Sequence, residues 1–159
     1  MIDQTLVLIK PDGVQRGLSG EIIHRFERVG LKIVAMRMVW VSKDFAKKHY
    51  KAHVDKPFYK GLEAMITEGP VIAMALEGVH AVELVRKMVG GTEPKSAAPG
   101  TIRGDYAHVS YEYADKRGIA IKNLIHASGN KEEAKVEVDL WFKKDELHSY
   151  KTVHEVHTL

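Results

Sequence analysis

The 159-residue sequence contains no cysteine, and this absence removes several kinds of chemistry at once. Disulfides, a thiolate nucleophile and cysteine-ligated zinc or iron–sulfur sites are all excluded, and the composition fits a reducing compartment. The first residues, Met1-Ile2-Asp3-Gln4, do not form a charged leader ahead of an apolar stretch. No apolar stretch in the sequence approaches the length of a membrane span. We therefore expect a soluble, cytoplasmic protein that does not associate with a membrane.

A strong excess of charge of either sign is also missing. The 24 lysines and arginines face 21 acidic residues, which leaves a formal net charge of +3. That surplus is too small to indicate a nucleic-acid-binding protein by composition. With 45% hydrophobic residues and no internal repeat or linker, the chain fits one compact core. We expect a single domain over residues 1–159.

Familiar nucleotide-binding signatures are absent as well. Lys95-Ser96 imitates the end of a P-loop, but Pro94 stands in place of its glycine and Val89 in place of its first glycine. No G-x-G-x-x-G occurs. The histidines at 49 and 53, and those at 154 and 157, lack the glutamate and spacing of a zinc-binding H-E-x-x-H, so we interpret them as surface histidines.

What the chain does contain is an alternation of apolar runs and amphipathic segments. Strands are predicted at Thr5–Ile9, Lys32–Val41 and Pro70–Leu76 and in the run that begins at Ile119. Helices are predicted from Ser19 to Gly30, from Ser42, after Pro57, after Gly78 and from Asn130, where Asn130 and Glu133 have the spacing of a capping box. Taken alone, this alternation is typical of a doubly wound parallel sheet.

Three connections stand out between these elements. Lys10-Pro11-Asp12-Gly13 is predicted to form a turn, because proline and glycine favour one there. Gly90 to Gly104 is predicted to be irregular, and a connection of that length is either functional or disordered. Tyr106 to Gly118 has no clean period and stays ambiguous.

The most informative stretch is Asn123-Leu124-Ile125-His126, which places an imidazole between an apolar run and the helix that starts at Asn130. A neutral imidazole can attack phosphorus, although a histidine can also simply close a strand. Arginine, lysine and threonine suit phosphate oxygens, and Lys10, Arg86, Thr92 and Arg103 could supply these groups. Taken singly, each of these residues is typical of an ordinary polar side chain on a protein surface.

Several motifs occur together in one order: Lys10-Pro11-Asp12-Gly13-Val14, Pro99-Gly100-Thr101-Ile102-Arg103-Gly104-Asp105, Asn123-x-x-His126 and Leu140-Trp141-Phe142. With them the chain resembles the nucleoside diphosphate kinase family from about Thr5 to Tyr150. The resemblance implies an α+β, ferredoxin-like βαββαβ fold. Its four-stranded antiparallel sheet is covered by helices, with a helical hairpin inserted between Ser42 and Ile66. We follow this implication over the doubly wound sheet. The resemblance also implies a homo-oligomer, a hexamer or a tetramer.

The resemblance implies that the γ-phosphoryl group of a nucleoside triphosphate such as ATP passes to a nucleoside diphosphate by a ping-pong mechanism. The intermediate is a phosphohistidine at His126, and the activity maintains the NTP and dNTP pools. Catalytic roles are implied for His126, Lys10, Tyr50, Asn123, Glu137 and Ser128. Nucleotide-binding roles are implied for Lys10, Phe58, Leu62, Arg86, Thr92, Arg103 and Asn123.

Within these roles, Glu137, steadied by Ser128, bonds one ring nitrogen of His126 and leaves the other free. Mg²⁺ is expected as the cofactor. It arrives on the nucleotide phosphates, because the chain has no dedicated carboxylate cage for a metal.

The chain departs from the family's pattern at three places. Ala127-Ser128-Gly129 follows the histidine where the family usually has Gly-Ser-Asp. The span from Asp105 to Asn123 is longer than usual, so residues 106–118 are predicted to be an insertion. Val153 to Leu159 replaces the family's C-terminal ending.

Two other functions remain as alternatives. Ferredoxin-like sheets also bind RNA or single-stranded DNA, and a pI of about 9.0 would suit that role. Against it, no strand carries the aromatic RNP1 pattern, and the cations are spread over separate segments, so we do not expect nucleic acid as a partner. A catalytically silent scaffold is the other alternative, but every matched functional position keeps its chemical type.

Overall fold

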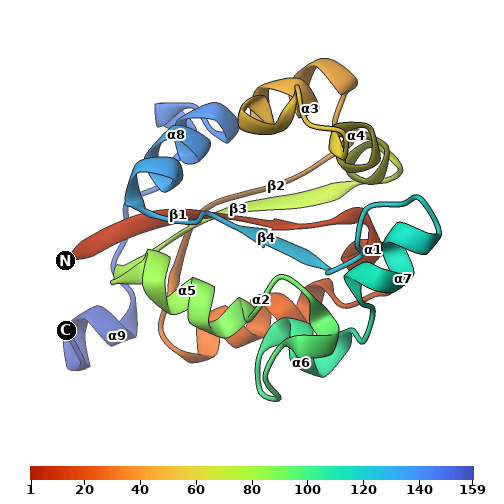
Figure 1. The fold of residues 1–159 in the computed structure, drawn as a ribbon. Helices are drawn as coiled ribbons and strands as arrows, with labels where there is room; N and C mark the ends of the chain where they lie inside the picture. Colours follow the sequence, from red (N-terminus) through yellow and green to blue (C-terminus); the bar gives the residue numbers. More distant parts are fainter.

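A four-stranded antiparallel sheet lies at the centre of the computed structural model, which describes residues 1–159 (Figure 1). Its strands are β1 (Ile2–Ile9), β2 (Lys32–Val39), β3 (Val71–Val79) and β4 (Ile125–Ala127), in the order β2-β3-β1-β4. All three pairings are antiparallel. The ferredoxin-like fold is therefore confirmed. The doubly wound sheet is wrong, because an alternation of strands and helices does not fix the direction in which each strand enters the sheet.

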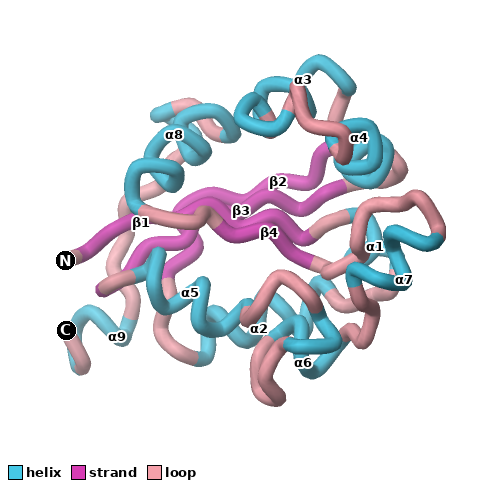
Figure 2. Tube along the Cα trace, in the orientation of Figure 1, coloured by secondary structure: helices cyan, strands magenta, loops and turns pink.

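Helices cover both faces of this sheet, as Figure 2 shows. The inserted hairpin of α3 (Lys43–His49) and α4 (Tyr59–Thr67) lies with α8 (Lys131–Trp141) on one face. The other face carries α2 (Ser19–Arg28), α5 (Ala81–Val89) and α6 (Ile102–Tyr106). The short helices are α1 (Pro11–Gln15), α7 (Tyr111–Lys116) and α9 (Val153–His157), with 3-10 turns at Lys51–His53, Pro94–Ser96 and Lys144–Glu146. No helix combines the length and the apolar character that a bilayer crossing requires.

Alternate residues of β1 supply two separate hydrophobic cores. Leu6 and Leu8 belong to the core under α3, α4 and α8, whereas Val7 and Ile9 belong to the core under α2 and α5. All four are fully buried. Because successive side chains of a strand point to opposite faces and both faces are covered, the run is apolar without interruption. The same alternation decides which face each functional side chain of the sheet occupies.

Two helix starts were predicted to the residue. The Ser42 hydroxyl accepts the backbone N–H of Phe45 at 3.2 Å, and the Asn130 side-chain oxygen accepts that of Glu133 at 2.8 Å. Each cap satisfies a donor that the first turn of a helix leaves without a partner. At α2 the prediction was off by one residue, since the helix begins at Ser19 and Leu18 occupies the cap position.

The strand predicted from Ile119 is wrong in its first part, because β4 spans only Ile125–Ala127. Leu124 has a φ of +73°, a left-handed conformation that ends the extended backbone just before β4. The preceding stretch packs instead on α4, where the backbone nitrogen of Ala120 lies 3.3 Å from the Cβ position of Gly61. Its apolar residues thus cover a helix rather than continue the sheet.

Three further expectations need correction. Lys10-Pro11-Asp12-Gly13 does not form a simple turn but opens α1, with Pro11 in the first turn, where its missing N–H costs nothing. Gly78 does not end the third strand, because β3 continues to Val79 and pairs Gly78 with Asp3. The strand predicted at Lys32–Val41 is two residues shorter, because β2 ends at Val39.

The two ambiguous regions contain short helices. The connection from Gly90 to Gly104 holds a 3-10 turn and the start of α6, and residues 106–118 hold α7. The N-terminus of α7 is tied back to the first connection: the side chain of Glu93 accepts the Tyr111 N–H at 3.0 Å. That residues 106–118 are an insertion stays a prediction.

Candidate active site

His126 occupies the middle of β4, directly opposite Leu8 of β1. Its neighbours Ile125 and Ala127 are buried in the core under α2 and α5. Since side chains alternate along a strand, the imidazole points to the other face, toward α8 and α3. The side chain remains 23% exposed, so the ring is held by the fold and still open on one side.

Glu137 on α8 holds one nitrogen of this ring. The His126 Nε2 lies 3.0 Å from both carboxylate oxygens of Glu137. An ionised carboxylate only accepts hydrogen bonds, so Nε2 carries the proton and the lone pair of the neutral ring sits on Nδ1. Ser128 orients the carboxylate, because its hydroxyl donates to Glu137 Oε2 at 2.6 Å while accepting the Leu6 N–H at 3.2 Å.

The charge state of Glu137 results from opposing effects. Burial favours its neutral form, but the hydrogen bonds from His126 and Ser128 and the adjacent imidazoles outweigh burial and lower the pKa of Glu137. The carboxylate therefore stays ionised at neutral pH. An ionised Glu137 is what keeps the lone pair of the neutral imidazole on Nδ1.

A second group of side chains gathers where β1 ends. The Lys10 ammonium donates to the Asn123 side-chain oxygen at 2.6 Å, and the Asn123 amide nitrogen donates to the Thr92 carbonyl at 2.8 Å. Both Lys10 and Asn123 are buried, whereas Thr92 is exposed. Burial, together with the charge of Arg103, lowers the pKa of Lys10 to about 8.

Arg103 is buried beside them and is anchored entirely to backbone. Its three donor groups contact the carbonyls of Asn123 at 3.2 Å, Gly90 at 3.1 Å and Ile125 at 2.6 Å. Burial and the nearby charge of Arg86 lower the pKa of Arg103 to about 10. Arg86 itself is exposed and makes no ion pair or side-chain hydrogen bond. Lys10, Arg103 and Arg86 thus form a cluster of cations whose mutual repulsion an anion would relieve.

The backbone around Leu124 links the two groups. Leu124 has a left-handed backbone conformation and is fully buried, and its backbone N–H donates to Asp12 Oδ2 at 3.0 Å. A Cβ on Gly13 would lie 2.8 Å from Ile9 and 3.0 Å from the Leu124 carbonyl, so α1 can approach this backbone only with glycine there. The resemblance gave Asp12 no role, and the geometry makes it a support for the turn between Asn123 and His126.

The predicted residues of the helical hairpin lie on the same face of the sheet as His126. Phe58 is 54% exposed, with its ring centre 5.5 Å from that of His53. Leu62 is partly buried against the core that contains Tyr50. Burial and the charge of Glu137 raise the pKa of Tyr50. Phe58 and Leu62 have no polar side-chain atoms, so they form an apolar edge of this face.

His49 was predicted to be a surface histidine, and this was wrong. Its ring centre lies 4.8 Å from that of His126, and Trp141 Nε1 donates to His49 Nδ1 at 3.2 Å. The sequence held a signal: Phe45, Ala46 and His49 share one helical stripe, and Ala46 is fully buried. The absence of a metal-binding motif says nothing about the burial of His49, whereas its place on that stripe indicates it.

His49, His126 and Glu137 place three possible metal ligands within 4.8 Å of one another. The Trp141 hydrogen bond argues against a metal there. Because His49 Nδ1 accepts, the neutral ring carries its proton on Nε2 and has no lone pair to offer an ion at that atom. The three residues are better described as a hydrogen-bonded and packed support for His126.

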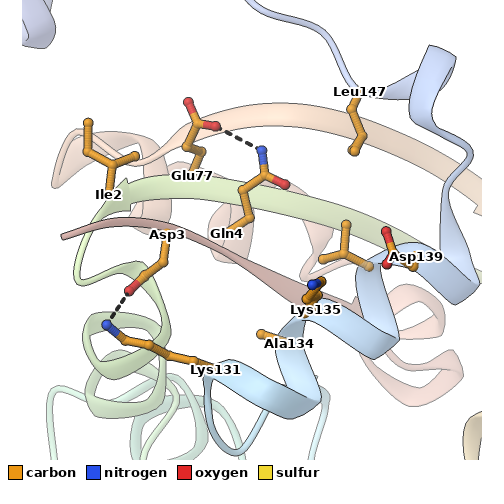
Figure 3. A pocket seen from close by; sticks show the side chains of 10 residues that line it. Ile2, Asp3, Gln4, Glu77, Lys131, Ala134, Lys135, Asp139 and Leu147 are labelled. Carbon is orange, nitrogen blue, oxygen red and sulfur yellow. Dashed lines mark hydrogen bonds and ion pairs between the residues drawn. The ribbon is translucent and has the colours of Figure 1, made fainter.

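A cavity of about 360 Å³ lies away from this site, between the start of β1, α8 and Leu147 (Figure 3). Four of its polar side chains are paired, since Lys131 pairs with Asp3 at 3.1 Å and Gln4 donates to Glu77 at 2.8 Å, and Lys135 and Asp139 also line it. His126 is paired with Leu8, at the opposite end of β1. This cavity therefore contains neither His126 nor the cation cluster of the candidate site.

Comparison with known proteins identifies the family. The sequence model of one family, described as nucleoside diphosphate kinase, matches residues 3–147. The chain is 56% identical over 148 residues to the nucleoside diphosphate kinase of Pyrococcus horikoshii, covering 93% of this chain and 90% of that protein. It is 49% identical over 146 residues to that of Thermus thermophilus, covering 92% and 99%.

Solved structures agree with this identification. A transition-state mimic of the nucleoside diphosphate kinase of Borrelia burgdorferi, with bound vanadate and ADP, superimposes with a TM-score of 0.93 at 45% identity and covers 97% of this chain and 95% of that chain. The enzyme of Halobacterium salinarum in complex with CDP gives a TM-score of 0.86 at 41% identity, covering 98% and 97%. The chain belongs to the nucleoside diphosphate kinase family, and its activity is that of a nucleoside diphosphate kinase.

Proposed function

We propose that the γ-phosphoryl group passes from a nucleoside triphosphate such as ATP to a nucleoside diphosphate by way of a phosphohistidine at His126. In the first half-reaction the Nδ1 lone pair bonds to the γ-phosphorus, and the bond from that phosphorus to the β–γ bridging oxygen breaks. The diphosphate leaves with that electron pair. In the second, a terminal oxygen of another diphosphate attacks the phosphorus, and the P–N electron pair returns to Nδ1. One observation carries the proposal: Glu137 holds Nε2 and leaves Nδ1 unprotonated.

Lys10, Arg86, Thr92 and Arg103 hold the β- and γ-phosphates in this proposal. Phosphoryl transfer depends on in-line positioning and on stabilising negative charge, and fixed cations supply both. The carbonyls that anchor Arg103 supply no negative charge to neutralise it, so its guanidinium favours an anion nearby. The vanadate and ADP bound to the similar Borrelia burgdorferi protein support a phosphate site of this kind.

The nucleoside occupies the apolar edge. Phe58 stacks on the base with Leu62 behind it, Lys10 and Asn123 bond the ribose hydroxyls, and Tyr50 lines the side of the nucleophile. Stacking leaves the base edges unread, because every base has a π-face. Weak discrimination among nucleotides follows, and it suits an enzyme that maintains both NTP and dNTP pools. Relatives solved with ADP and with CDP support this breadth.

Mg²⁺ accompanies the nucleotide and neutralises phosphate charge as the phosphoryl group moves. The groups at the end of β1 fit this arrangement, since they are cations and an amide that bind phosphate rather than a set of oxygen ligands for a metal. Asp12, the acidic residue among them, has one oxygen committed to the Leu124 N–H.

A homo-oligomer, a hexamer or a tetramer, is part of the same proposal. β2 is an edge strand of the sheet, and Met36 and Met38 within it and Trp40 just after it are 55%, 59% and 65% exposed. The C-terminal segment covers only the start of this strand, where the His148 N–H and the Tyr150 hydroxyl bond the carbonyls of Val34 and Ile33. An unpaired strand edge with exposed apolar side chains favours association. Light scattering on the purified chain gives the number of subunits, and a monomeric mass would refute this part.

The direct test is labelling with MgATP that carries radioactive γ-phosphate. The parent protein should form a phosphoenzyme that is labile in acid and stable in alkali, and His126→Gln should form none. Label that persists in His126→Gln would show that the nucleophile is assigned wrongly.

Steady-state kinetics distinguish the ping-pong route from direct transfer. Varying ATP at several fixed concentrations of a diphosphate acceptor should give parallel lines in a double-reciprocal plot. Intersecting lines would mean that both nucleotides bind together, and the phosphohistidine would then be excluded as an obligatory intermediate.

A further inference from the structure

His49 is a half-buried residue whose ring packs against that of His126, and nothing in the proposed phosphoryl transfer uses it. Its ring lies nearly perpendicular to that of His126, with an angle of 85° between the planes and 4.8 Å between the ring centres. Burial and the charge of His126 lower the pKa of His49 to about 3. His49 is therefore neutral near pH 7, and the proposed phosphoryl transfer gives it no proton to move.

Trp141 fixes how this neutral ring is turned. Its Nε1–H donates to His49 Nδ1 at 3.2 Å, and Trp141 is itself 1% exposed at the end of α8. The remaining nitrogen of His49, Nε2, is buried and has no partner in the chain. A buried donor without a partner is destabilising, and such groups often mark a functional constraint.

The Glu137 contact leaves the His126 ring incompletely restrained. Both carboxylate oxygens lie 3.0 Å from the same atom, Nε2, so they fix that atom without fixing the plane of the ring. Attack on phosphorus requires the Nδ1 lone pair to lie in line with the breaking bond, and an error of about 1 Å can cost about a hundredfold in rate. A second restraint on the ring plane is needed, and a perpendicular neighbouring ring provides one.

We propose that His49 is a positioning residue for His126. Trp141 holds the His49 ring in one orientation, and that ring then sets the plane of the His126 imidazole so that Nδ1 points at the incoming phosphorus. This inference rests on the phosphohistidine route. It predicts that the ring of His49 matters for rate, whereas its Nδ1 matters for stability.

The variant His49→Asn separates these two roles. An asparagine oxygen can take the place of Nδ1 and accept the Trp141 N–H, but it presents no ring to His126. We expect a melting temperature close to that of the parent. Single-turnover phosphorylation by MgATP should slow by about tenfold or more, with the nucleotide KM unchanged. A phosphorylation rate equal to that of the parent would overturn the proposal.

His49→Phe makes the opposite change. It keeps a ring against His126 and leaves the Trp141 N–H unpaired, so the melting temperature should fall while phosphorylation stays within a few-fold of the parent rate. If His49→Phe is folded and yet as slow as His49→Asn, positioning by the ring is wrong. The matched control is His24→Asn, because His24 is exposed on α2, remote from the site, and its replacement should change neither quantity.

A spectroscopic readout keeps this test independent of turnover. In NMR spectra of the imidazoles, His126 should keep its Nε2–H tautomer in every variant, because Glu137 is unchanged. The side-chain χ2 angle of His126 should have a single value in the parent and in His49→Phe and several values in His49→Asn. A single, unchanged ring orientation in His49→Asn would refute the inference. If the parent itself formed no phosphoenzyme at His126, the proposed function would fail instead, and the two failures are thereby distinguishable.

Discussion

At the start of β1, Lys131 pairs with Asp3, and Lys32 pairs with Glu77, so both carboxylates have a cation as counterpart within the chain. At the end of the same strand Lys10 lies beside Arg103, and burial together with the charge of a neighbouring cation lowers the pKa of each, while the charge of Asp12 acts on both in the opposite direction. Both ends present polar groups near the surface, but at the end of β1 the cations outnumber the one nearby carboxylate, Asp12. A ligand is expected where the chain's own charges do not satisfy one another, and a cavity alone does not indicate that.

Removing Arg103 should have the largest effect on this contrast. Arg103→Ala deletes the guanidinium and leaves three carbonyls without their donor, so we expect kcat/KM to fall by about 10³-fold or more. The free energy of unfolding should fall by on the order of 3 kcal/mol. Steady-state kinetics and urea unfolding measure the two effects. Activity within tenfold of the parent would mean that the cation cluster does not stabilise the moving phosphoryl group.

The substitution Glu137→Gln should have the next largest effect on activity. The amide has almost the same shape, but its NH₂ group can donate to His126 Nε2 and favour the tautomer that carries the proton on Nδ1. We expect phosphorylation by MgATP to slow by about 10²-fold with little change in nucleotide affinity. A rate equal to that of the parent would remove Glu137 from the account, whereas a loss of affinity without a loss of rate would place it in binding.

The lowered pKa of Lys10 gives a pH dependence with opposite signs for activity and stability. The cationic form binds phosphate, so kcat/KM should fall as pH rises through about 8. In the unfolded chain the Lys10 ammonium keeps its proton up to a pKa of about 10.5. Between about pH 8 and 10.5 the unfolded state therefore binds more protons than the folded state. As pH rises through this range, the contribution of Lys10 to the free energy of unfolding becomes more favourable. Lys10→Met should lose both trends, and a kcat/KM profile that is the same in parent and variant would contradict this explanation.

A substitution at the start of β1, where Lys131 pairs with Asp3, should have the smallest effect on activity and stability. Lys131→Met breaks a half-exposed ion pair and leaves Asp3 bonded to the Val82 N–H at 3.1 Å. The free energy of unfolding should change by less than about 1 kcal/mol, and kcat/KM should stay within about twofold of the parent. A large loss of activity in Lys131→Met would abolish the distinction between the two ends.

Much of this arrangement could be predicted from the sequence, and the exceptions share a physical cause. The antiparallel sheet, the inserted hairpin and the caps at Ser42 and Asn130 followed from resemblance and local chemistry. What failed were features set by distant partners. Leu124 is held in its left-handed conformation by Asp12, 112 positions away, and His49 is turned by Trp141, 92 positions away. Local propensity carries no information about such contacts, so the short β4 and the packing of the half-buried His49 against His126 were not predicted.

The most direct test of the contrast is an NMR titration of the lysine side chains with and without MgADP. Lys10 should titrate at about 8 in the free protein and at a higher pH when the diphosphate is bound, because the anion compensates the cluster. Lys131, already paired with Asp3, should not change. If MgADP binds and the pKa of Lys10 stays at about 8, the cations at the end of β1 are not the phosphate site, and the account is contradicted.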